Sequence, residues 1–271
     1  MKKQHTIKGQ RLSYIDKGKG DVLLFGHSYL FDQNMWQPQI DALSKHYRCI
    51  VPDLWGHGES EASPCCMTSI YDNSEYMIEL MDHLNIDHFS LVGLSVGGMW
   101  GATLAANHPS RINALVLMGT YLGDEPENSQ GLYFGLLDQI DDEQSISKAM
   151  AQTITPFFFA PQSIEQGLPC VEAFNQRLQS FTKEQLPELT NIGRLIFSRA
   201  NALQQLQKIT APVLILTGEE DLPRPVSESQ TMLNYLKRGK LDIIPKAGHI
   251  SALEQPDFIN NKLKNFFARV L

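Results

Sequence analysis

The sequence has few cysteines, no long apolar run and no strongly basic segment, and each shortage excludes a class of protein. Only 4 of the 271 residues are cysteines, and no two of them have the Cys-x-x-Cys spacing of zinc or redox sites. No stretch approaches about 18 uncharged apolar residues, so we expect no membrane partner. No run of basic residues is longer than two, which argues against a nucleic-acid partner.

The composition is that of one large domain, with or without an insertion, that has its own apolar core. Hydrophobic residues make up 42% of the chain, and the net charge is −7. The first residues contain no apolar stretch of the kind that a secretory signal requires. We therefore expect a cytoplasmic protein with reduced thiols, in which Cys49 is buried in a strand. Neither a cofactor nor a metal ion is expected, and a homodimer is left open.

Short apolar runs alternate with longer amphipathic stretches through most of the chain. This rhythm predicts an α/β fold with a doubly wound, mostly parallel sheet that is covered on both faces. We assign residues 1–121 and 208–271 to this core. The expected strands are 6–8, 10–17, 22–25, 47–51, 88–92, 112–118, 212–217 and 240–244, and the expected helices are 35–44, 67–84, 96–107 and 250–270.

The strand pattern is interrupted between the two parts of this core. Residues 122–207 contain no convincing strand, and prolines divide them into several helical patterns. We expect about four helices here, forming a cap over the carboxyl ends of the strands. The aromatic residues of this segment, among them Phe157, Phe158 and Phe159, would pack the cap and line part of a pocket beneath it.

One serine stands in a setting that exposes its hydroxyl group. Ser95 lies in Gly93-Leu94-Ser95-Val96-Gly97, after an apolar run and before a helix rich in small residues. A glycine on each side lets the backbone turn sharply there, which pushes the hydroxyl out at the corner between strand and helix. We therefore predict that Ser95 is a nucleophile.

A serine hydroxyl needs a base that accepts its proton and a group that orients that base. His249 follows the last expected strand, and Asp221 comes three residues after the glycine that ends the strand before it. Because the carboxyl ends of parallel strands share one edge of the sheet, both side chains should meet Ser95 there. Asp124, after an earlier strand, is the alternative acid.

Several further motifs extend this pattern over nearly the whole chain. They are His27-Ser28-Tyr29, the loop Pro52-Asp53-Leu54-Trp55-Gly56-His57-Gly58-Glu59-Ser60, the segment 93–99 and Pro109-Ser110-Arg111-Ile112. With Asp221 and His249, these motifs resemble α/β-hydrolases of the esterase and lactonase type. The segments 93–99 and 115–118 are similar to those of 3-oxoadipate enol-lactonases. The resemblance implies an α/β-hydrolase fold and a Ser-His-Asp triad.

Two backbone N–H groups are expected to form the oxyanion hole. The N–H of Val96 lies at a helix N-terminus directly after the nucleophile, where helical N–H groups have no partner. The resemblance implies that the N–H of Tyr29 is the second donor. This chain has Ser28 where the family usually has glycine, so the Ser28 side chain would either narrow the hole or add a third donor.

The expected function is hydrolysis of small, uncharged carboxylic esters with a short or medium acyl group. An apolar lining favours such substrates, and no cluster of Lys or Arg lies near the motifs in the sequence. Two alternatives stay open: an enol-lactone hydrolase, and a ligand receptor or stress regulator with slow hydrolysis. We expect the pocket walls to include Ser28, Tyr121, Phe158, Leu222 and Ile250.

Overall fold

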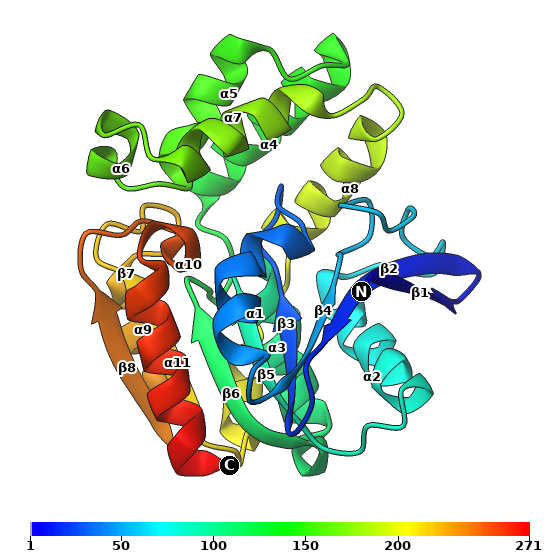
Figure 1. The fold of residues 1–271 in the computed structure, drawn as a ribbon. Helices are drawn as coiled ribbons and strands as arrows, with labels where there is room; N and C mark the ends of the chain where they lie inside the picture. Colours follow the sequence, from blue (N-terminus) through cyan, green and yellow to red (C-terminus); the bar gives the residue numbers. More distant parts are fainter. Residues whose placement is uncertain (1) are drawn as a thin grey trace.

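The apolar runs of the chain form one eight-stranded sheet with helices on both faces (Figure 1). The computed structural model describes residues 2–271. The strand order is β1-β2-β4-β3-β5-β6-β7-β8, in which β2 pairs antiparallel with β1 and β4, and all later neighbours pair in parallel. The strands are β1 Lys2–Ile7, β2 Gln10–Lys17, β3 Val22–Gly26, β4 Arg48–Pro52, β5 Phe89–Leu94, β6 Ile112–Met118, β7 Val213–Gly218 and β8 Gly239–Ile244.

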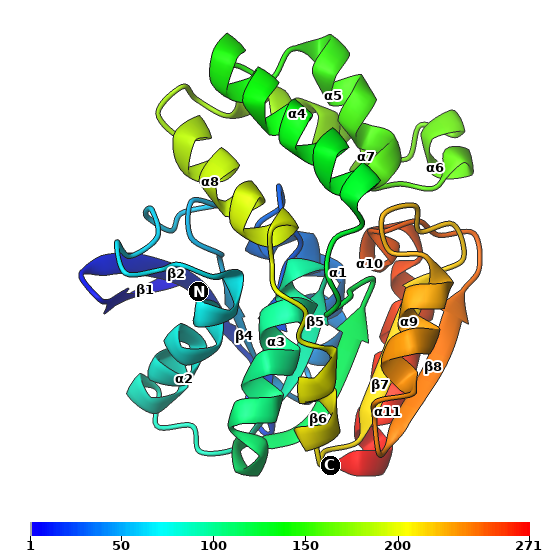
Figure 2. The same ribbon diagram turned by 180° about the vertical axis from the view of Figure 1, so that it is seen from behind.

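Helices cover the two faces of this sheet as the doubly wound pattern predicts. Figure 1 shows α1 and α11 on one face, and the reverse view in Figure 2 shows α2, α3 and α9 on the other. These helices are α1 Gln37–Leu43, α2 Asn73–His83, α3 Val96–Asn107, α9 Val226–Leu233 and α11 Pro256–Val270. The predicted α/β fold is therefore confirmed, and Cys49 is fully buried in β4 as expected.

Two helix predictions need correction, and one helix was not predicted. The helix expected over 67–84 begins only at Asn73, because the Ser69 side chain caps a short 3-10 turn, Ile70–Asp72, in front of it. The helix expected over 250–270 is divided into α10 Ser251–Glu254 and α11, because Pro256 starts a new helix at its first position. Helix α9 was not predicted, and its eight residues bury only Ser229 and Met232, which gives a weak apolar pattern.

Five helices connect β6 to β7 and lie over the carboxyl ends of the strands (Figures 1 and 2). They are α4 Glu127–Glu143, α5 Lys148–Ile154, α6 Pro161–Glu165, α7 Pro169–Ser180 and α8 Leu186–Phe197. We call this group of helices the cap.

Among the described residues, no helix is both long and apolar enough to cross a membrane.

The small residues of α3 allow it to lie close against the sheet. A Cβ atom added at Gly97 would stand 2.2 Å from the carbonyl oxygen of Gly26 at the end of β3. Any side chain at Gly97 would therefore separate the helix from the strand. This contact fixes the start of α3, and so the turn that carries Ser95, against the loop that follows β3.

Candidate active site

Ser95 occupies a strained turn between β5 and α3. Its φ of 57° and ψ of −121° are unusual for a residue with a side chain. The turn is held because the Ser95 carbonyl oxygen accepts hydrogen bonds from the Gly98 N–H at 2.9 Å and the Thr120 hydroxyl at 2.7 Å. A Cβ atom at Gly93 would lie 2.4 Å from the Gly97 carbonyl oxygen, so this close approach requires glycine.

His249 and Asp221 lie together in the loops that follow β8 and β7. The imidazole Nδ1 of His249 is 3.1 Å from both carboxylate oxygens of Asp221, and both side chains are buried. Because a carboxylate accepts hydrogen bonds, the proton of the neutral imidazole belongs on Nδ1, which leaves Nε2 as the acceptor. Gly119 makes room for the pair, since a Cβ there would be 2.8 Å from Asp221 Oδ2.

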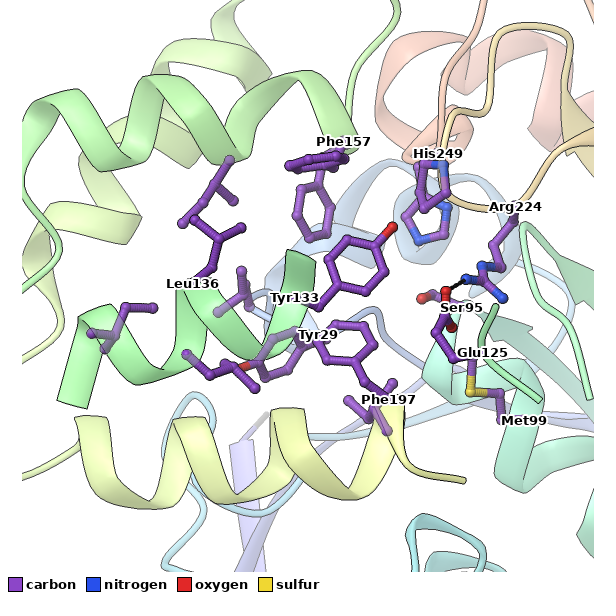
Figure 3. Close-up of a pocket in the computed structure, with 17 residues that line it drawn as sticks. Tyr29, Ser95, Met99, Glu125, Tyr133, Leu136, Phe157, Phe197, Arg224 and His249 are labelled. Atoms are coloured by element: carbon purple, nitrogen blue, oxygen red, sulfur yellow. Dashed lines mark hydrogen bonds and ion pairs between the residues drawn. The ribbon is translucent and has the colours of Figure 1, made fainter. Parts of the chain in front are cut away.

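Ser95 and His249 line the same pocket (Figure 3). Within residues 2–271 no hydrogen bond joins the Ser95 hydroxyl to the imidazole. Such contacts are often long in hydrolases without substrate and shorten in the Michaelis complex. The alternative acid, Asp124, accepts a hydrogen bond of 3.1 Å from the Asn201 side chain, and within residues 2–271 no hydrogen bond joins its carboxylate to His249.

Two backbone N–H groups, one directly after Ser95 and one from a residue of the same pocket, are available to bind a negative charge. In the described part of the chain, the N–H groups of Tyr29 and Val96 donate to no protein acceptor. Val96 starts α3, so its N–H is at the positive end of a helix dipole. Ser28 is fully buried outside the pocket wall, and no hydrogen-bond partner for its hydroxyl is found among residues 2–271.

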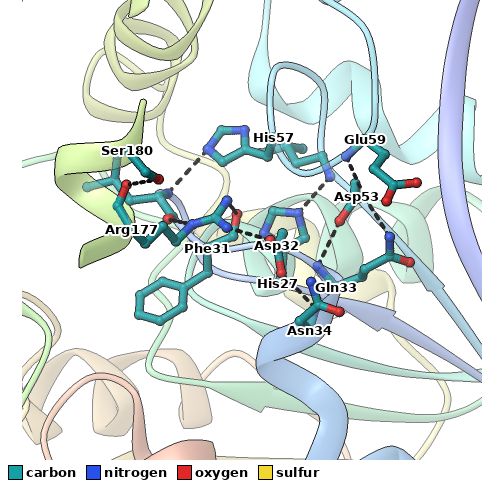
Figure 4. A network of polar contacts seen from close by, with 12 residues as sticks. His27, Phe31, Asp32, Gln33, Asn34, Asp53, His57, Glu59, Arg177 and Ser180 are labelled. Atoms are coloured by element: carbon teal, nitrogen blue, oxygen red, sulfur yellow. Dashed lines mark hydrogen bonds and ion pairs between the residues drawn. The ribbon is translucent and has the colours of Figure 1, made fainter. Parts of the chain in front are cut away.

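The core holds the loop that carries Tyr29 through buried polar groups (Figure 4). His27 Nε2 accepts the Leu54 N–H at 2.7 Å, and burial lowers the pKa of His27 to about 4. The carboxylate of Asp53 accepts the Gln33 N–H at 2.7 Å and its side-chain amide at 2.8 Å. Burial raises the pKa of Asp53 to about 7. The resemblance to the family pointed to these loops, but the sequence did not give the role of each side chain.

The pocket above Ser95 contains about 730 Å³ of empty space, part of it open to solvent. Its wall on the cap side is apolar (Figure 3) and consists of Leu136, Leu137, Ile140, Ile154, Phe157, Ile196 and Phe197. Phe158 lines the pocket as predicted. Four other residues predicted for the wall, Ser28 among them, do not line the pocket. Tyr121 packs beside Gly123, Leu222 is 62% exposed, and Ile250 is fully buried.

A buried ion pair at the opposite side of the pocket was not predicted. Glu125 binds the guanidinium groups of both Arg224 and Arg199, the latter at 2.7 Å, and Glu125 and Arg224 line the pocket near Ser95. The Tyr133 hydroxyl lies beside Arg224, and burial raises the pKa of Tyr133 to about 12, so this tyrosine stays protonated. The pocket therefore has an apolar side and a polar side, whereas the sequence suggested an apolar lining without arginine.

Comparison with known proteins gives the same framework. A model of the alpha/beta hydrolase fold family matches residues 21–256. The chain is 28% identical over 266 residues to 3-oxoadipate enol-lactonase 2 of Acinetobacter baylyi, covering 97% of this chain and 96% of that protein.

Two solved structures have the same fold over almost the whole chain. The enol-lactonase from Burkholderia xenovorans LB400 superposes with a TM-score of 0.86 and 25% identity, covering 98% of this chain and 100% of that one. A thermophilic esterase from Thermogutta terrifontis gives a TM-score of 0.88 at 23% identity, over 100% and 99% of the two chains, and this likeness concerns the fold alone. The family match and the relatives support hydrolase activity, and the chain belongs to the α/β-hydrolase fold family.

Proposed function

We propose that this protein hydrolyses carboxylic esters through an acyl-enzyme formed on Ser95. The observation that carries the proposal is one pocket that combines a serine on a strained turn with the buried Asp221–His249 pair. Val96 follows Ser95 in the chain, Tyr29 lines the same pocket, and within residues 2–271 the N–H groups of both have no protein acceptor. No metal ion is needed for this chemistry, because the base and the oxyanion donors are protein groups.

In the proposed reaction, the Ser95 hydroxyl attacks the ester carbonyl while His249 Nε2 accepts its proton. Asp221 holds the imidazole in the tautomer with the proton on Nδ1 and stabilises the cation that forms. The N–H groups of Tyr29 and Val96 bind the oxyanion of the tetrahedral intermediate. His249 then protonates the leaving alcohol, and water repeats the sequence to release the acid and regenerate Ser95.

The apolar side of the pocket supports a substrate with a short or medium hydrocarbon group. Leu136, Phe157 and Phe197 extend this wall away from Ser95, and none of them offers a hydrogen-bonding group (Figure 3). A hydrocarbon chain placed here would lose contact with water along its length, which stabilises binding by about 0.8 kcal/mol per buried methylene.

A lactone is the second candidate substrate, and the polar side of the pocket favours it. Arg224, Glu125 and the Tyr133 hydroxyl give this side donors and acceptors close to Ser95. Arg224 and Glu125 bind each other, but Arg224 Nη1 has no hydrogen-bond partner among residues 2–271. A compact lactone with additional oxygen atoms could bind this donor, whereas the hydrocarbon part of a simple alkyl ester could not. The name of the Acinetobacter relative, an enol-lactonase, is consistent with this alternative.

The proposal is tested by turnover of p-nitrophenyl esters from acetate to decanoate and of an enol-lactone, with wild type and two serine variants. Ser95→Ala should abolish turnover, while Ser90→Ala should keep it, because Ser90 is buried in β5 without a partner for its hydroxyl within residues 2–271. Full turnover by Ser95→Ala would refute the proposal. A single burst without further turnover would favour the ligand receptor, and much faster cleavage of the lactone would favour the lactonase.

A further inference from the structure

The residue after Tyr29 has a strained backbone that is held from two sides. Leu30 has φ = 67°, in the left-handed region that residues with side chains seldom adopt. From the core, His57 Nε2 accepts the Leu30 N–H at 3.2 Å, and burial lowers the pKa of His57 to about 3, so this nitrogen stays an acceptor. From the cap, Arg177 Nε in α7 donates to the Leu30 carbonyl oxygen at 2.6 Å.

Arg177 holds the next two residues of the same loop as well (Figure 4). Its Nη2 donates to the Phe31 carbonyl oxygen at 3.1 Å, and its Nη1 binds the Asp32 carboxylate. Burial raises the pKa of Asp32, but the positive charge of Arg177 and the hydrogen bond from the Asn34 N–H act together against this effect, and the pKa is lowered overall. One guanidinium group therefore binds three consecutive residues that lie 145 to 147 positions earlier in the chain.

These contacts determine where the Tyr29 N–H points. The Phe31 N–H donates to the Ser28 carbonyl oxygen at 3.2 Å, and His27 Nδ1 lies 2.8 Å from the same oxygen. That oxygen and the Tyr29 N–H belong to one planar trans peptide, in which they point in opposite directions. Fixing Phe31 therefore fixes the Ser28 carbonyl group, and with it the direction of the Tyr29 N–H.

The cap adds an aromatic contact and one hydrogen bond to this loop. The Phe31 ring stacks on Phe174 of α7, with centroids 4.6 Å apart and planes 6° from parallel. The Tyr29 hydroxyl donates to the Leu189 carbonyl oxygen of α8 at 2.8 Å. Within the cap, the guanidinium of Arg177 lies 5.4 Å from the ring centre of Phe181. The loop that carries an oxyanion donor is thus bound to the cap along its length.

We propose that Arg177 is a positioning residue for the oxyanion hole, so that the cap as well as the core determines the geometry of the Tyr29 donor. The inference rests on the proposed function, because Tyr29 must bind the oxyanion for its direction to affect rate. A lysine could not replace Arg177, since its single ammonium group lacks the planar set of donors that reaches three acceptors at once. Misplacing a group by about 1 Å can lower a rate on the order of 10²-fold.

The first test uses a fluorophosphonate probe, which reacts with activated serines and needs no knowledge of the natural substrate. Ser95 Oγ attacks the phosphorus, fluoride leaves, and the proton of the hydroxyl passes to His249, so the rate reports on the oxyanion hole. We expect Arg177→Met to lower the maximal rate constant kinact by roughly 10- to 100-fold, with KI nearly unchanged. Arg177→Lys should retain the charge beside Asp32 and still lose at least about 5-fold.

The matched control is Arg194→Met. Arg194 belongs to the same cap but pairs within it, with Asp138 and Asp141, and within residues 2–271 no hydrogen bond or ion pair joins it to the loop after β3. Its kinact should stay within about 2-fold of wild type. A wild-type kinact in folded Arg177→Met or Arg177→Lys would overturn the proposal, because a residue with only a structural role would change stability and leave kinact intact.

A second measurement separates this inference from the proposed function. Amide hydrogen exchange of a peptide that covers residues 27–33 should rise in Arg177→Met and Arg177→Lys and stay at the wild-type level in Arg194→Met. If the wild-type protein does not react at Ser95, the proposed function fails, and the exchange data still report whether Arg177 holds the loop. Unchanged exchange in both Arg177 variants would contradict the inference even if Ser95 reacts normally.

Discussion

The core and the cap build the two halves of the pocket with different kinds of contact. The core contributes Ser95, His249 and Asp221, all of which lie at the ends of strands and depend on close backbone packing or hydrogen bonds. The cap contributes a wall of aliphatic and aromatic side chains from α4, α5 and α8. Reactive groups need fixed directions, whereas a hydrocarbon chain needs only a shape that excludes water. The difference predicts that substitutions in the core affect rate and folding, and that substitutions in the cap wall affect substrate choice.

The largest effect is expected at the acid. Asp221→Asn should lower kcat on the order of 10⁴-fold, because an amide cannot hold the required tautomer of His249 or stabilise its cation. Asp124→Asn is the matched control, since Asp124 accepts a hydrogen bond from Asn201 and none from His249 within residues 2–271. Steady-state kinetics on one ester would measure both. Equal losses in the two variants, or a larger loss in Asp124→Asn, would show that the acid has been misassigned.

Two glycine substitutions compare the packing of core and cap. Gly97→Ala should lower the free energy of unfolding by about 3 kcal/mol or more, because its methyl group would stand 2.2 Å from the Gly26 carbonyl oxygen. Gly131→Ala in α4 should raise it by about 0.5–1 kcal/mol, because that methyl group meets no atom within 4 Å and alanine favours a helix. Urea denaturation would measure both values. Similar changes in the free energy of unfolding at the two positions would contradict the difference in packing between α3 in the core and α4 in the cap.

The buried carboxylate that holds the loop after β3 should make stability depend on pH. Because burial raises the pKa of Asp53 from 3.8 to about 7, the native protein holds more protons than the unfolded chain between these values. The free energy of unfolding should therefore fall as pH rises through this window, by at most about 1.4 kcal/mol per pH unit.

Asp53→Asn should reduce that slope, which denaturation at pH 5, 6 and 7 would reveal. Burial also raises the pKa of Glu228 to about 7. Glu228→Gln should therefore reduce the pH dependence of the free energy of unfolding further, in the same direction as Asp53→Asn. A slope unaltered by Asp53→Asn would mean that Asp53 does not titrate in this range.

The smallest effect is expected in the cap wall. Leu136 is half-buried and lines the apolar side of the pocket. Leu136→Phe should fill part of that side and lower kcat/KM for p-nitrophenyl decanoate by roughly 10-fold, while the value for the acetate changes little. A chain-length series would measure this selectivity. An equal loss of kcat/KM for all chain lengths would show that the long acyl group does not bind along the apolar side of the pocket.

The sequence was informative where a residue has a local backbone requirement. The glycines around Ser95 and the positions of Asp221 and His249 after strand ends follow from β-strand patterns and turn chemistry, so the side chains that meet at this edge could be named. The alternation of apolar runs likewise predicted the doubly wound sheet.

Contacts between distant parts of the chain could not be predicted in this way. Arg224 and Glu125 are 99 residues apart, and no local pattern distinguishes their buried ion pair from two solvent-exposed charges. The same holds for Arg177 and its three acceptors. The apolar stripe of a cap helix shows that one side is buried, but not whether it faces the pocket or another helix.

The central claim is that Ser95 is acylated during turnover. Wild-type protein should be mixed with p-nitrophenyl acetate, quenched with acid within milliseconds, digested and analysed by mass spectrometry. The account predicts a burst of nitrophenol and a mass increase of one acetyl group on the peptide that contains Ser95, and neither signal with Ser95→Ala. Turnover without acetylation of that peptide, or acetylation of another residue that persists in Ser95→Ala at the same rate, would contradict it.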